Sequence, residues 1–198
     1  MSALFSPLVK AVVFDLGNVL VEWTPLAVLS EEFMAETDFF SWNTELDRGA
    51  SFADTMERLR TEFPHHVAHT DAFNERWPET LGSVIQETVD VVDSLKAAGV
   101  RCFVLSNSSA ETVPRSELLT ELLTKFDGVL LSGEVRLLKP DLAIFRAAEE
   151  RFCLDPYSTW FVDDNEANAE AATAAGWHGI HFTDPAALKP VLEEAGLL

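Results

Sequence analysis

Short apolar runs rich in β-branched residues recur along the chain, and polar residues end each of them abruptly. The first begins at Ala11 and ends at Asp15, and three more cover 100–105, 128–131 and 159–162. A weaker fifth run covers 179–182. A continuous apolar run, unlike an alternating one, suits a strand that is covered on both faces. The pattern therefore predicts five buried strands.

Helical periodicity fills the intervals between these runs. Residues 84–98 place apolar side chains on one face, and a second helical pattern follows Lys139-Pro140. A third pattern covers 166–175, with alanine on nearly all inner positions so that its backbone could approach a sheet closely, and Asp184-Pro185 opens a fourth. Strands that alternate with helices predict an α/β fold with a doubly wound parallel sheet and right-handed crossovers.

The segment after the first strand breaks this alternation. Residues 25–82 contain no comparable apolar run, but they include amphipathic stretches such as 31–40 and 52–63. We therefore expect a helical insertion. In an open parallel sheet, ligands bind beyond the carboxyl ends of the strands, so an insertion after the first strand would overhang that crevice as a lid. The expected division is an α/β core of residues 1–22 and 84–198 and a helical cap of residues 23–83.

Four of the predicted strands lead into polar or charged residues, which should converge on one crevice. These residues are Asp15, Ser106 with Asn107, Lys139, and Asp163 with Asp164. Three carboxylates brought together repel and raise one another's pKa, so a site that keeps them ionised needs a cation. Oxygen ligands with room for water and a phosphate suit Mg²⁺ better than zinc, for which no suitable Cys and His set stands nearby. A carboxylate beside Mg²⁺ and an ammonium can attack phosphorus, because both cations neutralise the charge that keeps nucleophile and phosphate apart.

Length, composition and charge limit the remaining possibilities. A chain of 198 residues with 47% hydrophobic and 24% charged residues is expected to fold as one domain or one with a modest insertion. Its net charge of −19 disfavours binding to nucleic acid and to anionic membrane surfaces. Met1–Lys10 lacks the basic and apolar regions of a secretory signal, so we expect a cytoplasmic protein, as a monomer or weak homodimer. Cys102 and Cys153 are too few for a disulfide framework and are expected to be small buried hydrophobes.

Four segments resemble the ordered motifs of the haloacid dehalogenase superfamily. They are Phe14-Asp15-Leu16-Gly17-Asn18-Val19-Leu20, Leu105-Ser106-Asn107, Lys139-Pro140-Asp141 and Phe161-Val162-Asp163-Asp164-Asn165. Their order matches across nearly the whole chain, and the insertion resembles the superfamily's type 1 cap. The resemblance implies a Mg²⁺-dependent phosphatase of a small phosphorylated metabolite, which acts through a phosphoaspartate intermediate.

The resemblance also implies a role for each residue of the motifs. Asp15 would be the nucleophile and a metal ligand, and Gly17 would offer its backbone carbonyl to Mg²⁺. Asp164 would complete the metal shell, with Asp163 beside it. Ser106 and Lys139 would hold the phosphoryl oxygens. Two secondary positions are Asn107, as a substrate contact, and Asn168, which closes the fourth motif.

The sequence departs from the superfamily at two positions. Phosphatases of the superfamily usually carry a second Asp, the general acid and base, where this chain has Gly17. The Asp-Leu-Gly-Asn-Val form is nonetheless similar to a bacterial branch that contains sugar-phosphate phosphatases, notably enzymes that act on α-glucose 1-phosphate. A glycosyl leaving group or a cap residue could compensate, and Glu22 is a conceivable local carboxylate. Arg136 stands where related proteins often have glycine, and we expect it to be a solvated loop residue.

Two other functions fit parts of this pattern. A 2-haloacid dehalogenase would use the same aspartate to displace halide without a metal, but in the superfamily it usually lacks the paired acids, so Asp163-Asp164 favours phosphate. A non-catalytic regulator with the same fold would explain Gly17.

The insertion also holds clusters of aromatic residues and histidines. For Trp23, Trp42 and Trp77 we expect packing in the core of the cap rather than a substrate pocket. His65, His66 and His69 are expected at a surface junction between cap helices, because no acidic or cysteine partner stands at zinc-like spacing.

Overall fold

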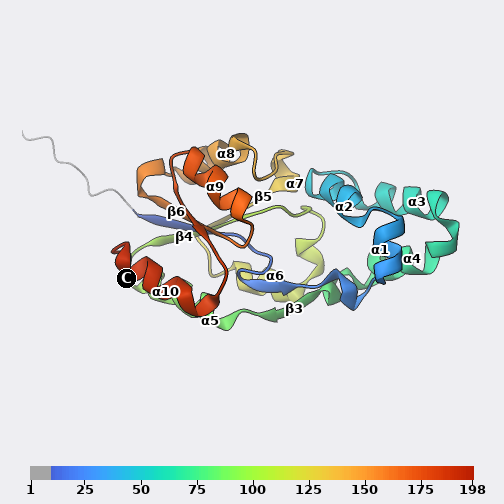
Figure 1. The fold of residues 1–198 in the computed structure, drawn as a ribbon, viewed down its shortest axis with the longest axis horizontal. Coiled ribbons are helices and arrows are strands. Elements are labelled where there is room, and N and C mark those ends of the chain that lie inside the picture. Colours follow the sequence, from blue (N-terminus) through green and yellow to red (C-terminus); the bar gives the residue numbers. More distant parts are fainter. Residues whose placement is uncertain (1–9) are drawn as a thin grey trace, which may run out of the picture.

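A parallel sheet of five strands, in the order β5-β4-β1-β6-β7, lies at the centre of the fold (Figure 1). The structure is a computed structural model and describes residues 10–198. The five strands are β1 (Ala11–Phe14), β4 (Arg101–Ser106), β5 (Gly128–Leu131), β6 (Thr159–Asp163) and β7 (His178–His181). These strands confirm the α/β prediction of a doubly wound parallel sheet.

Helices cover both faces of this sheet (Figure 1). On one face lie α5 (Gln86–Ala97), α6 (Glu117–Leu123) and α10 (Pro185–Glu194), and on the other lie α7 (Ser132–Val135), α8 (Leu142–Phe152) and α9 (Glu166–Ala174). Alternate residues of β1 belong to different cores, because successive side chains of a strand point to opposite faces. Val12 and Phe14 pack into the first core, and Ala11 and Val13 into the second. The uninterrupted apolar run that predicted β1 is therefore explained by burial on both sides.

Helix α9 lies unusually close to β7. A Cβ atom added at Gly179 would stand 2.0 Å from the carbonyl oxygen of Ala169, so only glycine permits this approach. Asn165 caps the helix by accepting the backbone N–H of Ala167. The expected close packing of the alanine-rich helix on the sheet is confirmed.

Cys102 is buried as expected, but the expectation for Cys153 is wrong. Its φ of 51° ends α8 in a left-handed cap, which leaves the residue exposed.

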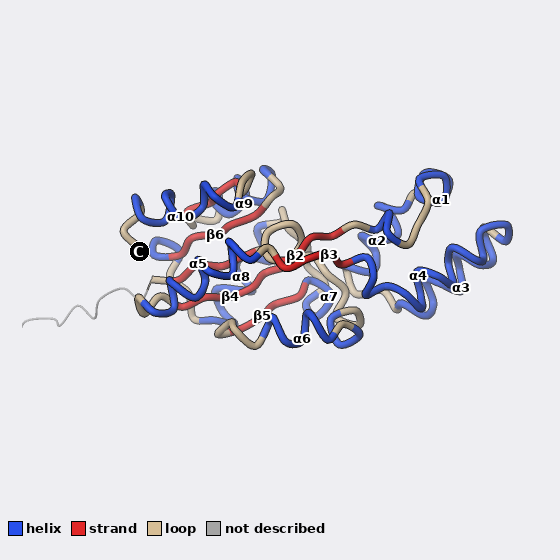
Figure 2. The backbone as a smooth tube through the Cα atoms, turned by 90° about the horizontal axis from the view of Figure 1, so that it is seen from below, coloured by secondary structure: helices blue, strands red, loops and turns tan. Residues whose placement is uncertain are grey.

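Four helices form an extension beyond one end of the sheet, clear in both Figure 1 and Figure 2. They are α1 (Glu31–Glu36), α2 (Phe39–Asp47), α3 (Phe52–Glu62) and α4 (Val67–Arg76). The pattern over 31–40 predicted one helix, but the chain breaks at Asp38, whose φ is 51°. A helix cannot continue through a left-handed residue, and Asp adopts that conformation more readily than most residues.

A small antiparallel sheet connects this extension to the core. It consists of β2 (Val21–Trp23) and β3 (Leu81–Val84), which run side by side between the five-stranded sheet and the helices (Figure 2). Neither strand was predicted from the sequence, because they are three and four residues long and only partly buried. The proposed domain boundaries after residues 22 and 83 fall inside them, and the division into core and cap remains a prediction.

Five single turns of 3₁₀ helix complete the described secondary structure, each with proline in its first turn. They are η1 (Pro25–Ala27), η2 (Pro64–His66), η3 (Trp77–Thr80), η4 (Val113–Arg115) and η5 (Pro156–Ser158). Among residues 10–198, every helix is too short or too polar to cross a membrane. The expectation about a signal sequence in Met1–Lys10 falls on residues 1–9, which lie outside the described part.

Candidate active site

A cavity of about 370 Å³ lies where the carboxyl ends of β1 and β4 and the residues just after β6 meet the cap. The sheet side supplies predicted site residues, namely Asp15, Gly17, Ser106, Asn107, Lys139, Asp164 and Asn168. The cap supplies Asn43, Leu46 and Asp47 from α2 and Trp77 from η3. The crossover connections of a parallel sheet bring these segments together at one edge although they are far apart in sequence. The predicted convergence of the strand ends is therefore what the structure shows.

The buried ammonium of Lys139 holds the centre of the site together. Its Nζ donates to Asp15 Oδ1 at 2.7 Å, to Asp163 Oδ2 at 2.6 Å and to the backbone carbonyl of Leu105 at 2.9 Å. These three acceptors use all three donors of the ammonium. Burial alone lowers the pKa of Lys139, but the two carboxylates outweigh it and hold the pKa above its ordinary value. The lysine therefore stays charged and neutralises part of the acidic cluster.

Asp15 follows β1 directly, and its backbone N–H donates to the carbonyl of Val162 on β6. This bond extends the sheet by one residue and fixes the carboxylate at the cavity. Burial raises the pKa of Asp15 to about 6, Lys139 opposes this rise, and Asp163 adds to it. A divalent cation beside the carboxylate would favour the ionised form that a nucleophile requires.

Asp163 and Asp164 have different environments although they are neighbours. Asp163 is fully buried and does not line the cavity. Its Oδ2 accepts from Lys139, and its Oδ1 accepts from the backbone N–H of Asn165 and the amide of Asn168. Asp164 is half-buried and lines the cavity, where its Oδ2 accepts from Asn18 at 3.2 Å. Burial raises the pKa of Asp164 above its ordinary value, and the Asn18 amide opposes that rise.

The acidic cluster suits a hard divalent cation. Asp15, Asp163 and Asp164 each present an oxygen within 4.8 Å of the others. The protein already engages both oxygens of Asp163, whereas Asp15, Gly17 and Asp164 line the cavity and are the residues that could hold the ion. A small set of oxygen donors beside an open cavity matches Mg²⁺, which retains several waters in protein sites.

Ser106 and Asn107 follow β4, and their polar atoms have different partners. Ser106 is almost fully buried, with its Oγ 3.0 Å from that of Ser108. The amide of Asn107 donates to the carbonyl of Lys139 and accepts from its backbone N–H, at 3.0 and 2.9 Å. Asn107 thus fixes the backbone that carries the lysine, and its contact with substrate stays a prediction.

Arg136 is exposed, as expected, and its φ of 59° explains why glycine suits this position.

Asp47, the last residue of α2, reaches the same cavity from the cap and was not predicted from the sequence. Its Oδ2 accepts from the amide of Asn43 at 3.1 Å, and its backbone carbonyl accepts from Ser132 at 2.5 Å. Burial raises its pKa to about 8, the backbone N–H of Ser109 opposes this rise, and Asp15 adds to it. The sequence did contain one signal, because an acidic residue at a helix C-terminus opposes the helix dipole.

Glu22 does not occupy the place suggested for it. Its side chain is exposed and accepts the backbone N–H of Ser83, while its neighbours Val21 and Trp23 line the cavity. Alternation along β2 points Glu22 to the opposite side. The suggestion of Glu22 as the local acid is therefore wrong.

Core packing is confirmed for Trp42 and Trp77, which are buried, although Trp77 also borders the cavity.

Comparison with known proteins identifies the family to which this chain is similar. The family profile for haloacid dehalogenase-like hydrolases matches residues 9–176. The chain is 26% identical over 181 residues to sesquiterpene phosphatase astK of Aspergillus oryzae, covering 88% of this chain and 90% of the relative. It is 31% identical over 91 residues to an (S)-2-haloacid dehalogenase of Pseudomonas putida, covering 46% and 40% of the two chains.

The fold also matches solved structures. One is a HAD family enzyme of Bacteroides thetaiotaomicron, in complex with magnesium and inorganic phosphate, with a TM-score of 0.63 and 22% identity over 85% of this chain and 91% of that one. Another, a HAD-like family hydrolase of Porphyromonas gingivalis, has a TM-score of 0.72 and 21% identity over 95% and 98% of the two chains. Together with the family match, these findings show that the chain belongs to the haloacid dehalogenase-like hydrolases.

Proposed function

We propose that this hydrolase is a Mg²⁺-dependent phosphatase that cleaves a small phosphomonoester through a phosphoaspartate on Asp15. The observation that carries the proposal is the buried lysine between two aspartates, with a third carboxylate within reach of the same point. Halide displacement needs no such accumulation of acids, whereas phosphoryl transfer needs cations at both nucleophile and phosphate. Mg²⁺, held by Asp15, Asp164 and the carbonyl of Gly17, would supply charge neutralisation for the transferred group.

The residues of the chain divide the reaction between them. An oxygen of Asp15 attacks phosphorus, and the bond from phosphorus to the ester oxygen breaks. Ser106 and Lys139 hold the phosphoryl oxygens, the ammonium by exchanging its bond to Asp15 for one to the phosphoryl group as Asp15 attacks. Asp163 keeps the ammonium in position by its 2.6 Å contact. Water then attacks phosphorus of the phosphoaspartate, which releases inorganic phosphate and restores the carboxylate of Asp15.

Asp47 supplies the proton that Gly17 cannot. It lines the same cavity as Asp15, and Asn43 and Ser132 fix its position. With a pKa of about 8, its carboxyl carries a proton at neutral pH and can donate it to the leaving oxygen. The resulting carboxylate then accepts a proton from the attacking water, so the acid is regenerated in each turnover.

The cap side of the cavity favours a substrate with an apolar body. Apolar side chains form much of the wall beyond the acidic cluster, and they are Val21, Trp23, Phe40, Leu46, Trp77, Leu81 and Leu119. Asn43, Thr44 and Asp47 are the cap's polar contributions. Sugar hydroxyls on this side would face these apolar side chains, which is costly where the hydroxyls lose water without gaining partners. A short alkyl or isoprenoid phosphate therefore fits better than the sugar phosphate suggested by resemblance.

One assay panel tests this function. Phosphate release is measured from an aryl phosphate, an isoprenoid phosphate and glucose 1-phosphate, with Mg²⁺ or with EDTA. Wild type should release phosphate only with Mg²⁺, fastest from the isoprenoid ester, and Asp15→Asn should release none. Release that survives EDTA or Asp15→Asn would refute the mechanism. Halide release from a 2-haloacid would instead establish a dehalogenase, and ligand-induced thermal stabilisation without turnover would support a regulator.

A further inference from the structure

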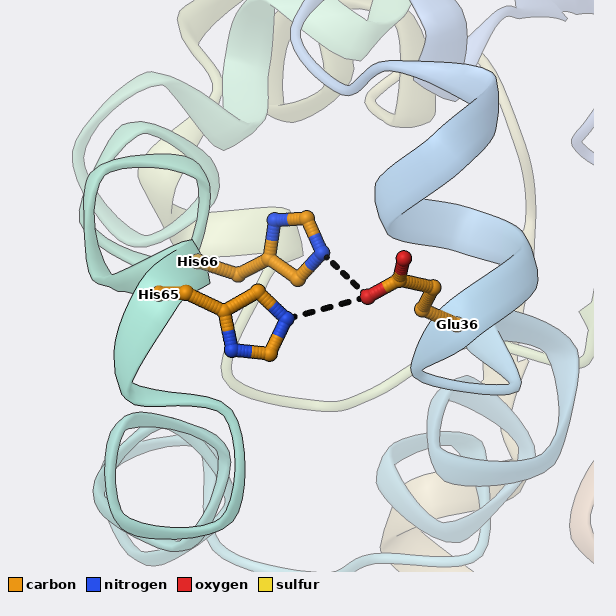
Figure 3. A group of neighbouring side chains, drawn as sticks. All are labelled: Glu36, His65 and His66. Atoms are coloured by element: carbon orange, nitrogen blue, oxygen red, sulfur yellow. Dashed lines mark hydrogen bonds and ion pairs between the residues drawn. The ribbon is translucent and has the colours of Figure 1, made fainter.

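Two histidines and a glutamate meet in the cap, far from the acidic cluster along the chain (Figure 3). Glu36 ends α1, while His65 and His66 belong to η2 across from it. The Nε2 atoms of His65 and His66 lie 3.0 and 2.9 Å from the same oxygen, Oε2 of Glu36. Figure 3 shows both rings directed at this carboxylate. Glu36 is the acidic partner that spacing along the sequence did not reveal.

We infer that Glu36, His65 and His66 form a binding site for a transition-metal dication, with Zn²⁺ as the best match. Two imidazoles and one carboxylate are a ligand set that zinc uses with water in its fourth position. Tetrahedral ligands at about 2.0–2.1 Å from zinc lie roughly 3.3 Å from one another. The two N···O distances are within a few tenths of an ångström of that value, so small side-chain shifts admit the ion.

The surroundings supply the outer contacts that a metal-binding histidine requires. His66 Nδ1 lies 3.4 Å from His69 Nδ1, and His69 Nε2 lies 3.4 Å from Ser30 Oγ. A ligating histidine usually donates its second ring N–H to such a partner, which fixes the ring. Ser30 caps α1 by accepting the backbone N–H of Phe33, and its oxygen has a second lone pair for His69. This chain of contacts ties the histidines to the helix that carries Glu36.

Exposure and charge leave the site open to an ion. The side chains of His65 and Glu36 are 61% and 47% exposed, whereas that of His66 is 7% exposed. One ligand is therefore held rigidly in the cap and two can adjust, while the open side leaves room for water. The net charge of −19 also raises the local concentration of cations. Because these residues lie outside the phosphatase cavity, this inference does not depend on the proposed function.

Zinc binding to the whole chain tests the site. Bound Zn²⁺ is counted after equilibrium dialysis in excess Mg²⁺, which competes with Zn²⁺ for the carboxylates of the acidic cluster. Wild type should bind one zinc ion at the cap. His65→Ala and Glu36→Gln should each weaken binding at least about 100-fold, because even an outer partner contributes roughly 10–100-fold. His69→Gln should weaken it within that smaller range. The matched control is His178→Ala, which removes an exposed histidine outside the cluster and should leave zinc binding unchanged.

Thermal unfolding gives a second readout. Zn²⁺ should raise the melting temperature of wild type and His178→Ala but not that of His65→Ala, because only an ion that binds the folded state stabilises it. Equal zinc binding by wild type, His65→Ala and Glu36→Gln would overturn the inference, and so would the absence of bound zinc in wild type. Phosphate release with Mg²⁺ should be unchanged in His65→Ala, which separates this site from the catalytic one.

Discussion

Replacing Asp47 by asparagine should make the protein more stable and less active at once. The wild-type carboxyl has its pKa raised from 3.8 to about 8, mainly by burial. Between about pH 4 and pH 8 the folded state holds a proton that the unfolded state has lost, so wild-type stability falls as pH rises through this window. At pH 7 the solution is about three pH units above the unfolded-state pKa of 3.8, which corresponds to at most about 4 kcal/mol of lost stability. Asparagine has no such ionisation cost, and its single side-chain oxygen can keep one of the two donated hydrogen bonds, from Asn43 or from Ser109.

Stability is measured by urea unfolding of Asp47→Asn and wild type from pH 4 to pH 8. The variant should match wild type near pH 4 and exceed it by about 1–4 kcal/mol at pH 7. The melting temperature should rise by at least about 2 °C, given roughly 2–4 °C per kcal/mol for a chain of this size. Asp54→Asn, at an exposed position of α3, is the control and should not develop this pH-dependent gain.

Activity should change in the opposite direction and depend on the leaving group. Loss of general acid catalysis costs about 10²–10⁴-fold, so kcat/KM for an alkyl phosphate should fall by that factor. p-Nitrophenyl phosphate should lose far less, because nitrophenolate leaves without a proton. The fall of wild-type kcat/KM for the alkyl ester above about pH 8 should disappear in the variant. Equal losses on both esters, or a destabilised variant, would refute the assignment of Asp47.

Three further predictions follow from the same geometry. Gly17→Asp in the Asp47→Asn background should raise kcat/KM for the alkyl phosphate about tenfold or more. The site has room for the new side chain, because a Cβ at residue 17 meets nothing nearer than Trp23 Cβ at 3.8 Å. Unchanged kcat/KM would show that the acid cannot act from residue 17. Lys139→Met should lower the free energy of unfolding by about 3–5 kcal/mol, because it leaves two buried carboxylates without their cation. Urea unfolding measures this loss, with Lys189→Met at an exposed position as the control. Equal stability of the two variants would contradict the prediction. In wild type, EDTA should abolish phosphate release and added Mg²⁺ should restore it. Asp164→Asn should need a far higher Mg²⁺ concentration for the same rate, because it removes one oxygen ligand. An unchanged Mg²⁺ requirement would show that Asp164 does not belong to the metal site.

Much of the catalytic core could be predicted from the sequence, because its strands are continuous apolar runs that alternate regularly with helices. A strand buried on both faces must be apolar throughout, so β1 is visible as four consecutive apolar residues that end at Asp15. Parallel topology then brings the residues that follow successive strands to one edge. These two rules predict that Asp15, Ser106, Lys139 and Asp164 lie around one cavity, and all four line it.

The partners of these residues depend on three-dimensional contacts that the sequence does not encode locally. Asp163 and Asp164 are adjacent and chemically identical, yet one faces Lys139 and the other faces the cavity, because successive residues at a strand end point in opposite directions. Glu22 looked suitable by its position near Asp15, but strand alternation turned it away. Spacing along the chain could not distinguish these cases.

The amino-acid sequence was enough to predict the parallel sheet and the meeting of the polar residues at its strand ends, because burial and periodicity act on neighbouring residues. What the cap contributes to this core follows only from the folded chain. Asp47 meets Asp15's cavity and Glu36 meets His65 and His66 through helix packing between segments that share no sequence pattern. Burial and proximity set both the raised pKa of Asp47 and the geometry of the histidine cluster, and these properties exist only once the chain has folded.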